Sequence, residues 1–168
     1  MAKLYLLFFC VIGIVLLGGL SGLLSMGFLV PYSGINAQLW YNGLNKLVDV
    51  PSVVFPIVWT LLYVLMGVSL YLVLISRGKG NNAKDKIRTK SLRLFIAQLF
   101  LNLLWSVVFF GLRLPAAALV EMVVLLSFIV LYMRASYKVS RTAGYLFLPY
   151  LIWVVFALFL NATIVFLN

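Results

Sequence analysis

The chain has 168 residues, of which 65% are hydrophobic and only 10% are charged. This composition leaves too little polar surface to cover a soluble globular fold, so a membrane protein is indicated and a water-soluble one is excluded. The 13 Lys and Arg residues outnumber the 3 Asp and Glu residues and give a net charge of +10. Because the basic residues flank apolar stretches, we expect them to meet a lipid bilayer with anionic headgroups, and we expect no nucleic acid partner.

Five apolar stretches approach or exceed the ~20 residues that a helix needs to cross a bilayer, where only helices satisfy the backbone of such segments. In chain order they cover about residues 4–26, 53–76, 92–111, 116–133 and 143–167. We therefore predict an all-α fold, an integral membrane bundle of five transmembrane helices, with residues 1–168 as a single domain. The first stretch has a longer apolar core than a signal peptide and lacks a small-residue cleavage site, so we favour an uncleaved helix.

The first span also holds the only cysteine, Cys10, which excludes a disulfide within this chain. Gly18 and Gly22 permit a close approach between helices, as in a homodimer contact. The chain contains no histidine, which removes the commonest ligand of zinc and haem iron and the usual general base near neutral pH. We therefore expect no metal site and no bound cofactor.

Basic residues are divided very unevenly between the two sides of the predicted bundle. The side that holds the N-terminus and the second and fourth connections has 11 of the 13, whereas the other side has only Lys46 and Arg113. The positive-inside rule then places the N-terminus inside and the C-terminus outside. The second connection, residues 77–91, begins with helix-breaking Gly and Asn residues, and we expect a wet cytoplasmic loop that determines this topology.

The longest connection, residues 27–52, lies on the outer side and contains Trp40 and Tyr41. An ordered segment rich in aromatic residues needs apolar surface to rest on, so this loop is expected to form a lid over the outer mouth of the bundle. The alternative is an interfacial anchor, because Trp and Tyr also gather at the level of the lipid headgroups. The residues alone do not separate these two interpretations.

Polar and aromatic residues inside the spans recur every three or four positions, which places them on single helix faces. These residues are Trp59, Tyr63 and Gly67 in the second span, Gln98, Asn102, Trp105 and Phe109 in the third, Glu121 in the fourth, and Trp153, Ala157 and Asn161 in the fifth. At a rise of about 1.5 Å per residue, most of them fall in the outer halves of their spans. They therefore share a depth below the outer loop.

Two interpretations of this convergence are open. The polar residues could be structural, with each interhelical hydrogen bond contributing only about 0.6 kcal/mol and with Glu121 protonated or paired with Arg113. Alternatively, they line a cavity for a flat, largely apolar ligand, with aromatic walls and a few orienting polar groups. The shared depth, the small Ala157 and the loop above favour the cavity. Pro149 predicts a kink in the fifth span, which either widens the bundle or adjusts packing.

Several short motifs follow in order from about Trp40 to the end of the chain. They are Trp40-Tyr41 with Leu44 and Lys46, Val58-Trp59-Thr60-Leu61-Leu62-Tyr63 with Met66-Gly67, Gln98-Leu99, Asn102 with Trp105-Ser106, Phe109-Phe110-Gly111, Pro149-Tyr150-Leu151 with Trp153, Phe156-Ala157 and Leu160-Asn161. In this order the set resembles the translocator protein family, also called tryptophan-rich sensory proteins or peripheral-type benzodiazepine receptors.

The resemblance implies a five-helix bundle, usually homodimeric, with a ligand pocket under the first long loop. Family members bind tetrapyrroles such as protoporphyrin IX, isoquinoline-carboxamide and benzodiazepine-type ligands and, in animals, cholesterol. Together with the helix faces identified from spacing, the resemblance predicts the following ligand-binding residues: Trp40, Tyr41, Trp59, Tyr63, Gln98, Asn102, Trp105, Glu121, Trp153, Phe156, Ala157 and Asn161. Some bacterial relatives degrade porphyrin in light, which would make Trp59 and Trp153 the reactive residues here.

This chain departs from the family pattern in two places. The usual Lys-Pro-x-Trp-x-Pro-Pro run is replaced by residues 46–51, which lack its Trp, and Ala162 stands where the animal cholesterol motif has Tyr. Val130, Tyr132 and Arg134 fit only a loose cholesterol pattern. We therefore expect weak or absent sterol recognition and altered geometry of the first loop.

The sequence thus predicts a membrane receptor or sensor for tetrapyrroles, placed in the bacterial inner membrane. The alternatives are a small transporter of tetrapyrroles or other apolar molecules and a light-dependent porphyrin-degrading activity. Transport requires access from both sides, whereas the polar residues cluster on the outer half only.

Overall fold

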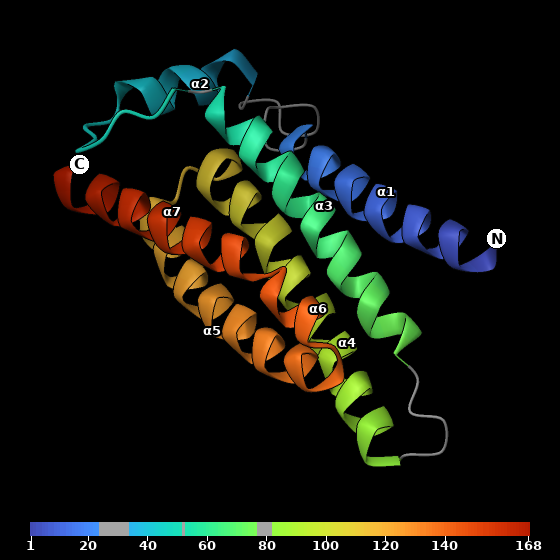
Figure 1. The fold of residues 1–168 in the computed structure, drawn as a ribbon. Helices are drawn as coiled ribbons and strands as arrows, with labels where there is room; N and C mark the ends of the chain where they lie inside the picture. Colours follow the sequence, from blue (N-terminus) through green and yellow to red (C-terminus); the bar gives the residue numbers. More distant parts are fainter. Residues whose placement is uncertain (24–33, 52, 77–81) are drawn as a thin grey trace.

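The computed structural model describes residues 1–23, 34–51, 53–76 and 82–168, and every regular element in this part of the chain is a helix (Figure 1). Five segments are long and apolar enough to cross a membrane, which confirms the predicted fold class. They are α1 (Ala2–Leu23), α3 (Val54–Ile75), α4 (Asn82–Ser106) continued by the π-helical turn η2 (Val107–Gly111), α5 (Pro115–Val139), and α6 (Arg141–Tyr145) followed by α7 (Leu148–Leu167). The single-domain organisation stays a prediction.

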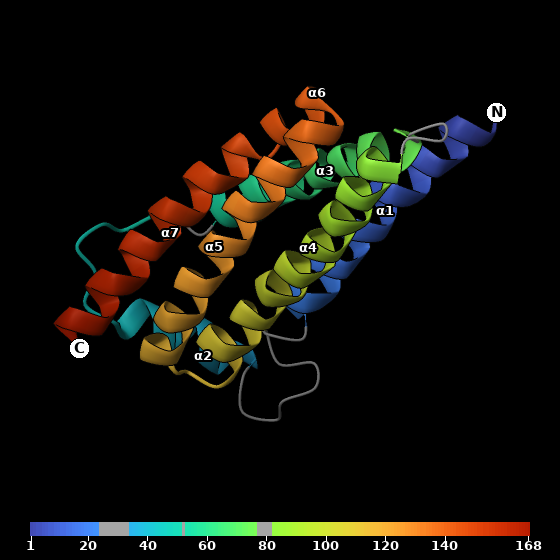
Figure 2. The same cartoon turned by 90° about the horizontal axis from the view of Figure 1, so that it is seen from below.

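Successive spans run in opposite directions, and the chain termini lie at opposite ends of the bundle (Figures 1 and 2). The most extensive packing joins α4 to α5 and α1 to α3, and α5 also packs against α7. A short helix, α2 (Gly34–Gly43), lies across one end of the bundle. We call this the α2 end. The other end, where α4 begins and α5 stops, is the basic end. Which end faces the cytoplasm stays a prediction.

Two glycines let α1 and α3 approach closely. A Cβ atom added to Gly67 would lie 2.6 Å from the Cα atom of Val11, and one added to Gly18 would overlap the ring of Tyr63. Gly18 therefore serves a contact within the chain, whereas a Cβ on Gly22 would meet no atom within 4 Å. The close approach predicted from small residues is real, but for Gly18 it joins α1 to α3 of the same chain.

The third and fourth spans are longer than predicted. Helix α4 begins at Asn82 instead of near residue 92, and α5 continues to Val139 instead of stopping near residue 133. The prediction of a loop over residues 77–91 is therefore wrong for residues 82–91. Residues 77–81 lie outside the described ranges. Lys, Arg and Ala favour helix, and Asp85 lies in the first turn, where the helix dipole favours an acidic side chain.

The fifth span is interrupted where the sequence predicted a kink. Helix α6 ends at Tyr145 and α7 begins at Leu148, with Pro149 in its first turn, where a missing N–H is tolerated. A second irregularity, η2, was not predicted: the Leu112 N–H donates to the Val107 carbonyl at 2.8 Å, five residues back. This wider turn places both Phe109 and Phe110 within ring contact of Tyr41.

The half of the bundle nearer the basic end is filled by side chains. Ser69 donates to the Ala143 carbonyl at 2.8 Å and therefore accepts from the Tyr132 hydroxyl, also at 2.8 Å. Tyr132 and Phe147 are fully buried and lie with ring centroids 4.2 Å apart. Because Tyr132 faces the core, the loose cholesterol pattern that includes it does not present its aromatic ring to lipid, which agrees with the expected weak sterol recognition.

Candidate ligand-binding site

A chain of hydrogen bonds joins three spans near the middle of the bundle. The Tyr63 hydroxyl on α3 donates to Oδ1 of Asn102 on α4 at 3.0 Å, and Nδ2 of Asn102 donates to the Tyr150 hydroxyl on α7, also at 3.0 Å. All three side chains are buried. Asn102 therefore has a structural role, as the first interpretation of the polar stripes expected, and it also fixes two aromatic rings beside the candidate site.

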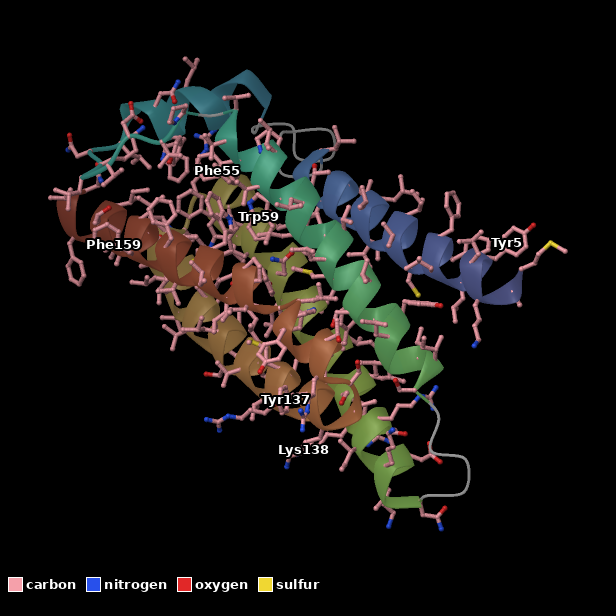
Figure 3. All side chains as sticks on the ribbon, viewed as in Figure 1. Tyr5, Phe55, Trp59, Tyr137, Lys138 and Phe159 are labelled. Atoms are coloured by element: carbon pink, nitrogen blue, oxygen red, sulfur yellow. The ribbon has the colours of Figure 1, made fainter. Side chains whose placement is uncertain are left out.

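Trp59 lies on the α2 side of this chain of hydrogen bonds. Its ring stacks on Tyr63, with centroids 5.5 Å apart and an interplanar angle of 28°, and it meets Tyr150 edge-on at 6.2 Å. Trp59 and Phe55 lie toward the α2 end of α3 (Figure 3). The indole is only partly buried and packs against the core, so it is not turned wholly to lipid.

The α2 helix rests on an aromatic cluster at the end of the third span. Trp40 meets Phe109 edge-on at 5.6 Å, Tyr41 contacts both Phe109 and Phe110, and Trp105 stacks on Phe109 at 5.0 Å and 19°. These contacts favour the lid interpretation over an interfacial anchor, because Trp40 and Tyr41 pack on protein.

The residues that follow α2 are tied to the rest of the loop and to the C-terminal residue. Lys46 Nζ lies 4.3 Å from the Tyr41 ring centroid, donates to the Tyr41 carbonyl at 3.1 Å, and pairs with Asp49 at 3.6 Å. Burial raises the pKa of the Tyr41 phenol, and the Asp49 carboxylate raises it further. Asn168 accepts from the Asn45 N–H at 3.0 Å and donates to the Asn45 carbonyl at 3.1 Å.

Phe55 connects the α2 cluster to the last span. Its ring lies 6.5 Å from that of Tyr41 and 6.1 Å from that of Trp153, which in turn contacts Phe156 at 5.5 Å. Rings from α2, α3, the end of α4 and α7 thus follow one another around the α2 end. Ala157, one turn beyond Trp153, is partly buried against the core.

Three polar groups at this end have buried atoms without a hydrogen-bond partner among the described residues. They are Nε1 of Trp105, Nε1 of Trp153 and both carboxylate oxygens of Glu121. Buried polar groups are nearly always satisfied, so unsatisfied ones at a candidate site require a partner such as a ligand or water. One interpretation of the sequence had expected Glu121 to pair with Arg113, but no hydrogen bond joins these two side chains.

Two of the expected site residues have mainly structural contacts. Gln98 is completely buried and donates to the Phe95 carbonyl of its own helix at 3.1 Å. With its carboxamide oriented to suit its neighbours, Asn161 donates to the Pro115 carbonyl and accepts from the Leu119 N–H, both at 3.1 Å. Asn161 therefore joins α7 to the first turn of α5. Whether either residue also contacts a ligand stays a prediction.

Phe55 and Tyr150 belong to this site but were not among the expected site residues. A signal for both was present in the sequence. Phe55 precedes Trp59 by one helical turn, and Tyr150 lies three residues before Trp153, so each extends a stripe that the spacing had already identified. Among the described residues, no group of His, Cys, Asp and Glu side chains is arranged to hold a metal ion.

The fold and the site define a class of protein: a multi-pass integral membrane protein whose aromatic residues gather under a loop helix at one end. The model of the TspO/MBR family matches residues 10–167. The chain therefore belongs to the TspO/MBR family, and the resemblance drawn from its motifs is confirmed.

Named relatives come from all three domains of life. The tryptophan-rich protein TspO of Chlorobaculum tepidum is 47% identical over 118 residues, which cover 70% of this chain and 72% of the relative. That of Archaeoglobus fulgidus is 37% identical over 155 residues, or 91% of this chain and 96% of the relative. The human translocator protein is 37% identical over 123 residues, or 73% and 70% of the two chains. The bacterial relatives agree with a multi-pass protein of a bacterial membrane.

Proposed function

We propose that this protein is a membrane receptor or sensor that binds a flat tetrapyrrole, such as protoporphyrin IX, at the α2 end. Isoquinoline-carboxamide and benzodiazepine-type molecules, which are also largely flat and apolar, are proposed to bind the same residues. The observation that carries this proposal is the set of aromatic side chains at the α2 end, together with buried Trp105, Trp153 and Glu121 atoms that have no hydrogen-bond partner among the described residues. Aromatic walls with a few orienting polar groups suit a flat conjugated ligand.

Trp59 and Trp153 are proposed as the principal stacking residues. They lie on α3 and α7, and each is only partly buried, so a ring face or edge remains for a ligand. Asn102 orients Tyr63 and Tyr150 beside them, and Ala157 leaves room next to Trp153. With no histidine in the chain, a free-base porphyrin fits better than a haem held by an axial imidazole.

The Trp59→Phe/Trp153→Phe double variant tests this proposal. Phe keeps an apolar ring but removes the larger indole face and, at Trp153, the N–H group. We expect at least tenfold weaker binding of protoporphyrin IX. Complete removal of a stacking ring costs roughly 1–3 kcal/mol per base in nucleic-acid complexes, and Phe keeps only part of the stacking surface at each of the two positions. The measurement is titration in detergent, followed through the visible absorption of the porphyrin.

Phe159→Leu is the matched control, because Phe159 lies on α7 with 47% of its side chain exposed and takes no part in the ring contacts. This control should bind porphyrin as the unmodified protein does. Equal affinity in the double variant would refute the assignment of the stacking residues.

The transporter alternative is less well supported. A transporter needs a route to both sides, but the half of the bundle nearer the basic end is filled by buried Met66, Ile129, Tyr132 and Phe147. Flux of porphyrin into proteoliposomes, absent from protein-free liposomes, would favour transport. Light-dependent degradation at Trp59 and Trp153 is a further alternative. It requires turnover of more than one porphyrin per protein, lost in darkness and in the double variant.

A homodimer is part of this proposal. The bundle exposes large apolar side chains on α1, α5 and α7 that lipid or a second copy would cover. Light scattering coupled to chromatography, corrected for bound detergent, gives the protein mass directly. A mass of one chain would contradict the dimer.

A further inference from the structure

The basic end of the bundle carries a hollow between α4 and α5 that takes no part in the candidate ligand site. Its volume is about 250 Å³, and its lining is Ile87, Lys90, Leu131, Arg134, Ala135 and Lys138. Figure 3 shows Lys138 at the end of the bundle opposite to Phe55 and Trp59. The lining therefore combines three basic side chains with three apolar ones on two neighbouring spans.

The basic residues of this hollow lack a counter-charge within the described chain. Lys90, Arg134 and Lys138 are exposed, and none of them makes an ion pair or a hydrogen bond with another described residue. Asp85 is the one acidic residue near this end. It lines a neighbouring hollow on α4 that shares Lys90 with this one, but it makes no ion pair with Lys90, Arg134 or Lys138. Three neighbouring cations without acidic partners attract a compact anion such as a phosphate.

The depth of the hollow matches the boundary between headgroups and hydrocarbon. At about 1.5 Å per residue, Arg134 lies roughly 29 Å along α5 from Pro115, close to the ~30 Å thickness of a hydrocarbon core. The same rise puts Lys90 roughly 31 Å from Gly111 in the third span, so the two cations stand at similar heights.

Leu131 extends the hollow toward the bilayer. It lies one turn deeper than Arg134 and Ala135 on the same face of α5, and 44% of its side chain is exposed. An anion held only by charge would need no such surface. A molecule with a phosphate and an attached hydrocarbon chain would use both parts of the lining.

We propose that this hollow is a binding site for an anionic phospholipid, of the phosphatidylglycerol type, from the leaflet at the basic end. Lys90, Arg134 and Lys138 hold the phosphate, with the planar guanidinium of Arg134 able to donate to two of its oxygens. Ile87 and Ala135 form the floor, and an acyl chain descends along Leu131. The site is independent of the porphyrin proposal, because the two share no residue.

Native mass spectrometry of the purified protein tests the proposal. It compares binding of phosphatidylglycerol with that of phosphatidylcholine carrying the same acyl chains. Each basic residue near an anionic membrane surface is worth about a fivefold factor in affinity, so we expect at least a tenfold preference for phosphatidylglycerol. The Lys90→Gln/Arg134→Gln/Lys138→Gln variant should lose most of this preference, and Lys138→Gln alone should lose about fivefold.

The control variant Lys3→Gln/Lys84→Gln/Arg141→Gln removes the same charge near the same end, but its residues do not line the hollow. It should keep the preference. If both triple variants lose the preference for phosphatidylglycerol equally, the effect is one of overall charge, and the proposal of a discrete site is overturned. Absence of any such preference in the unmodified protein would also overturn it. Displacement of the lipid by soluble glycerol 3-phosphate would identify a site for free phosphate and also contradict the proposal.

Discussion

Asn102 is the residue on which the packing of three spans converges. Its carboxamide accepts from Tyr63 on α3 and donates to Tyr150 on α7, in surroundings that expose no more than 8% of any of the three side chains. In a bilayer the unfolded spans also find polar partners, so each of these interhelical hydrogen bonds contributes about 0.6 kcal/mol on average and up to about 1.7 kcal/mol.

At this scale we predict that Asn102→Leu lowers the free energy of unfolding by roughly 1–3 kcal/mol, because two interhelical hydrogen bonds are lost while the side-chain volume is nearly kept. Thermal unfolding in detergent measures this. Ser127→Ala is the control, since Ser127 is exposed and donates only to the Val123 carbonyl of its own helix. Equal midpoints for the two variants would show that the chain of hydrogen bonds does not stabilise the bundle.

Helical spacing identified much of the candidate site, because it depends only on local geometry. Trp59 and Tyr63, predicted on one helix face, are in ring contact, and Asn102 bonds across helices, as the structural interpretation of the polar stripes expected. Spacing did not show that Asn161 bonds to the first turn of α5, since that bond depends on how α7 crosses α5. The partners of a buried amide are set by tertiary packing.

Helix α1 influences the candidate ligand site, although none of the ring contacts described at the α2 end involves a side chain of α1. Gly18 leaves the space that the Tyr63 ring occupies, and Tyr63 in turn stacks on Trp59 and donates to Asn102. A methyl group at residue 18 must therefore displace Tyr63 or separate α1 from α3. Either movement reaches the α2 end.

We predict that Gly18→Ala weakens porphyrin binding about threefold or more and lowers thermal stability by roughly 1–3 kcal/mol, the usual range for overpacking. Gly19→Ala is a matched control on the adjacent residue, where an added Cβ would meet no atom within 4 Å. Absorption titration and thermal unfolding of both variants give the comparison. Equal porphyrin affinity and thermal stability of Gly18→Ala and Gly19→Ala would mean that α1 moves aside without displacing Tyr63.

The lengths of α4 and α5 differed from the sequence-based expectation where the apolar run stops but the helix continues into basic residues. Apolar runs located all five spans, but they underestimated α4 and α5, whose amphipathic, basic turns extend beyond the apolar part. The π-helical turn was not predictable from spacing. It is accompanied by contacts of Phe109 and Phe110 with Trp40 and Tyr41, which come from a distant part of the chain.

For the whole molecule, the distribution of charge and the fold agree. Basic residues gather at the end of the bundle that includes the start of α1, the start of α4 and the end of α5, whereas the α2 end has Lys46 and Arg113. The structure places the termini at opposite ends of the bundle, and the positive-inside rule predicts which end faces the cytoplasm.

Labelling of single cysteines checks this sidedness. In a Cys10→Ala background, Leu47→Cys places a thiol in the outer loop and Thr89→Cys places one on the basic part of α4; both positions are exposed. In intact cells, we expect a membrane-impermeant maleimide to label Leu47→Cys at least tenfold faster than Thr89→Cys. After permeabilisation both should react. The reverse order would invert the topology.

The four tryptophans of the chain, Trp40, Trp59, Trp105 and Trp153, all lie toward the α2 end, and each contacts other aromatic rings there. The intrinsic ultraviolet fluorescence of the protein therefore originates from one region. A guest that absorbs near 350 nm and settles there would receive excitation by energy transfer from several indoles at once, whereas events at the basic end would leave the emission nearly unchanged.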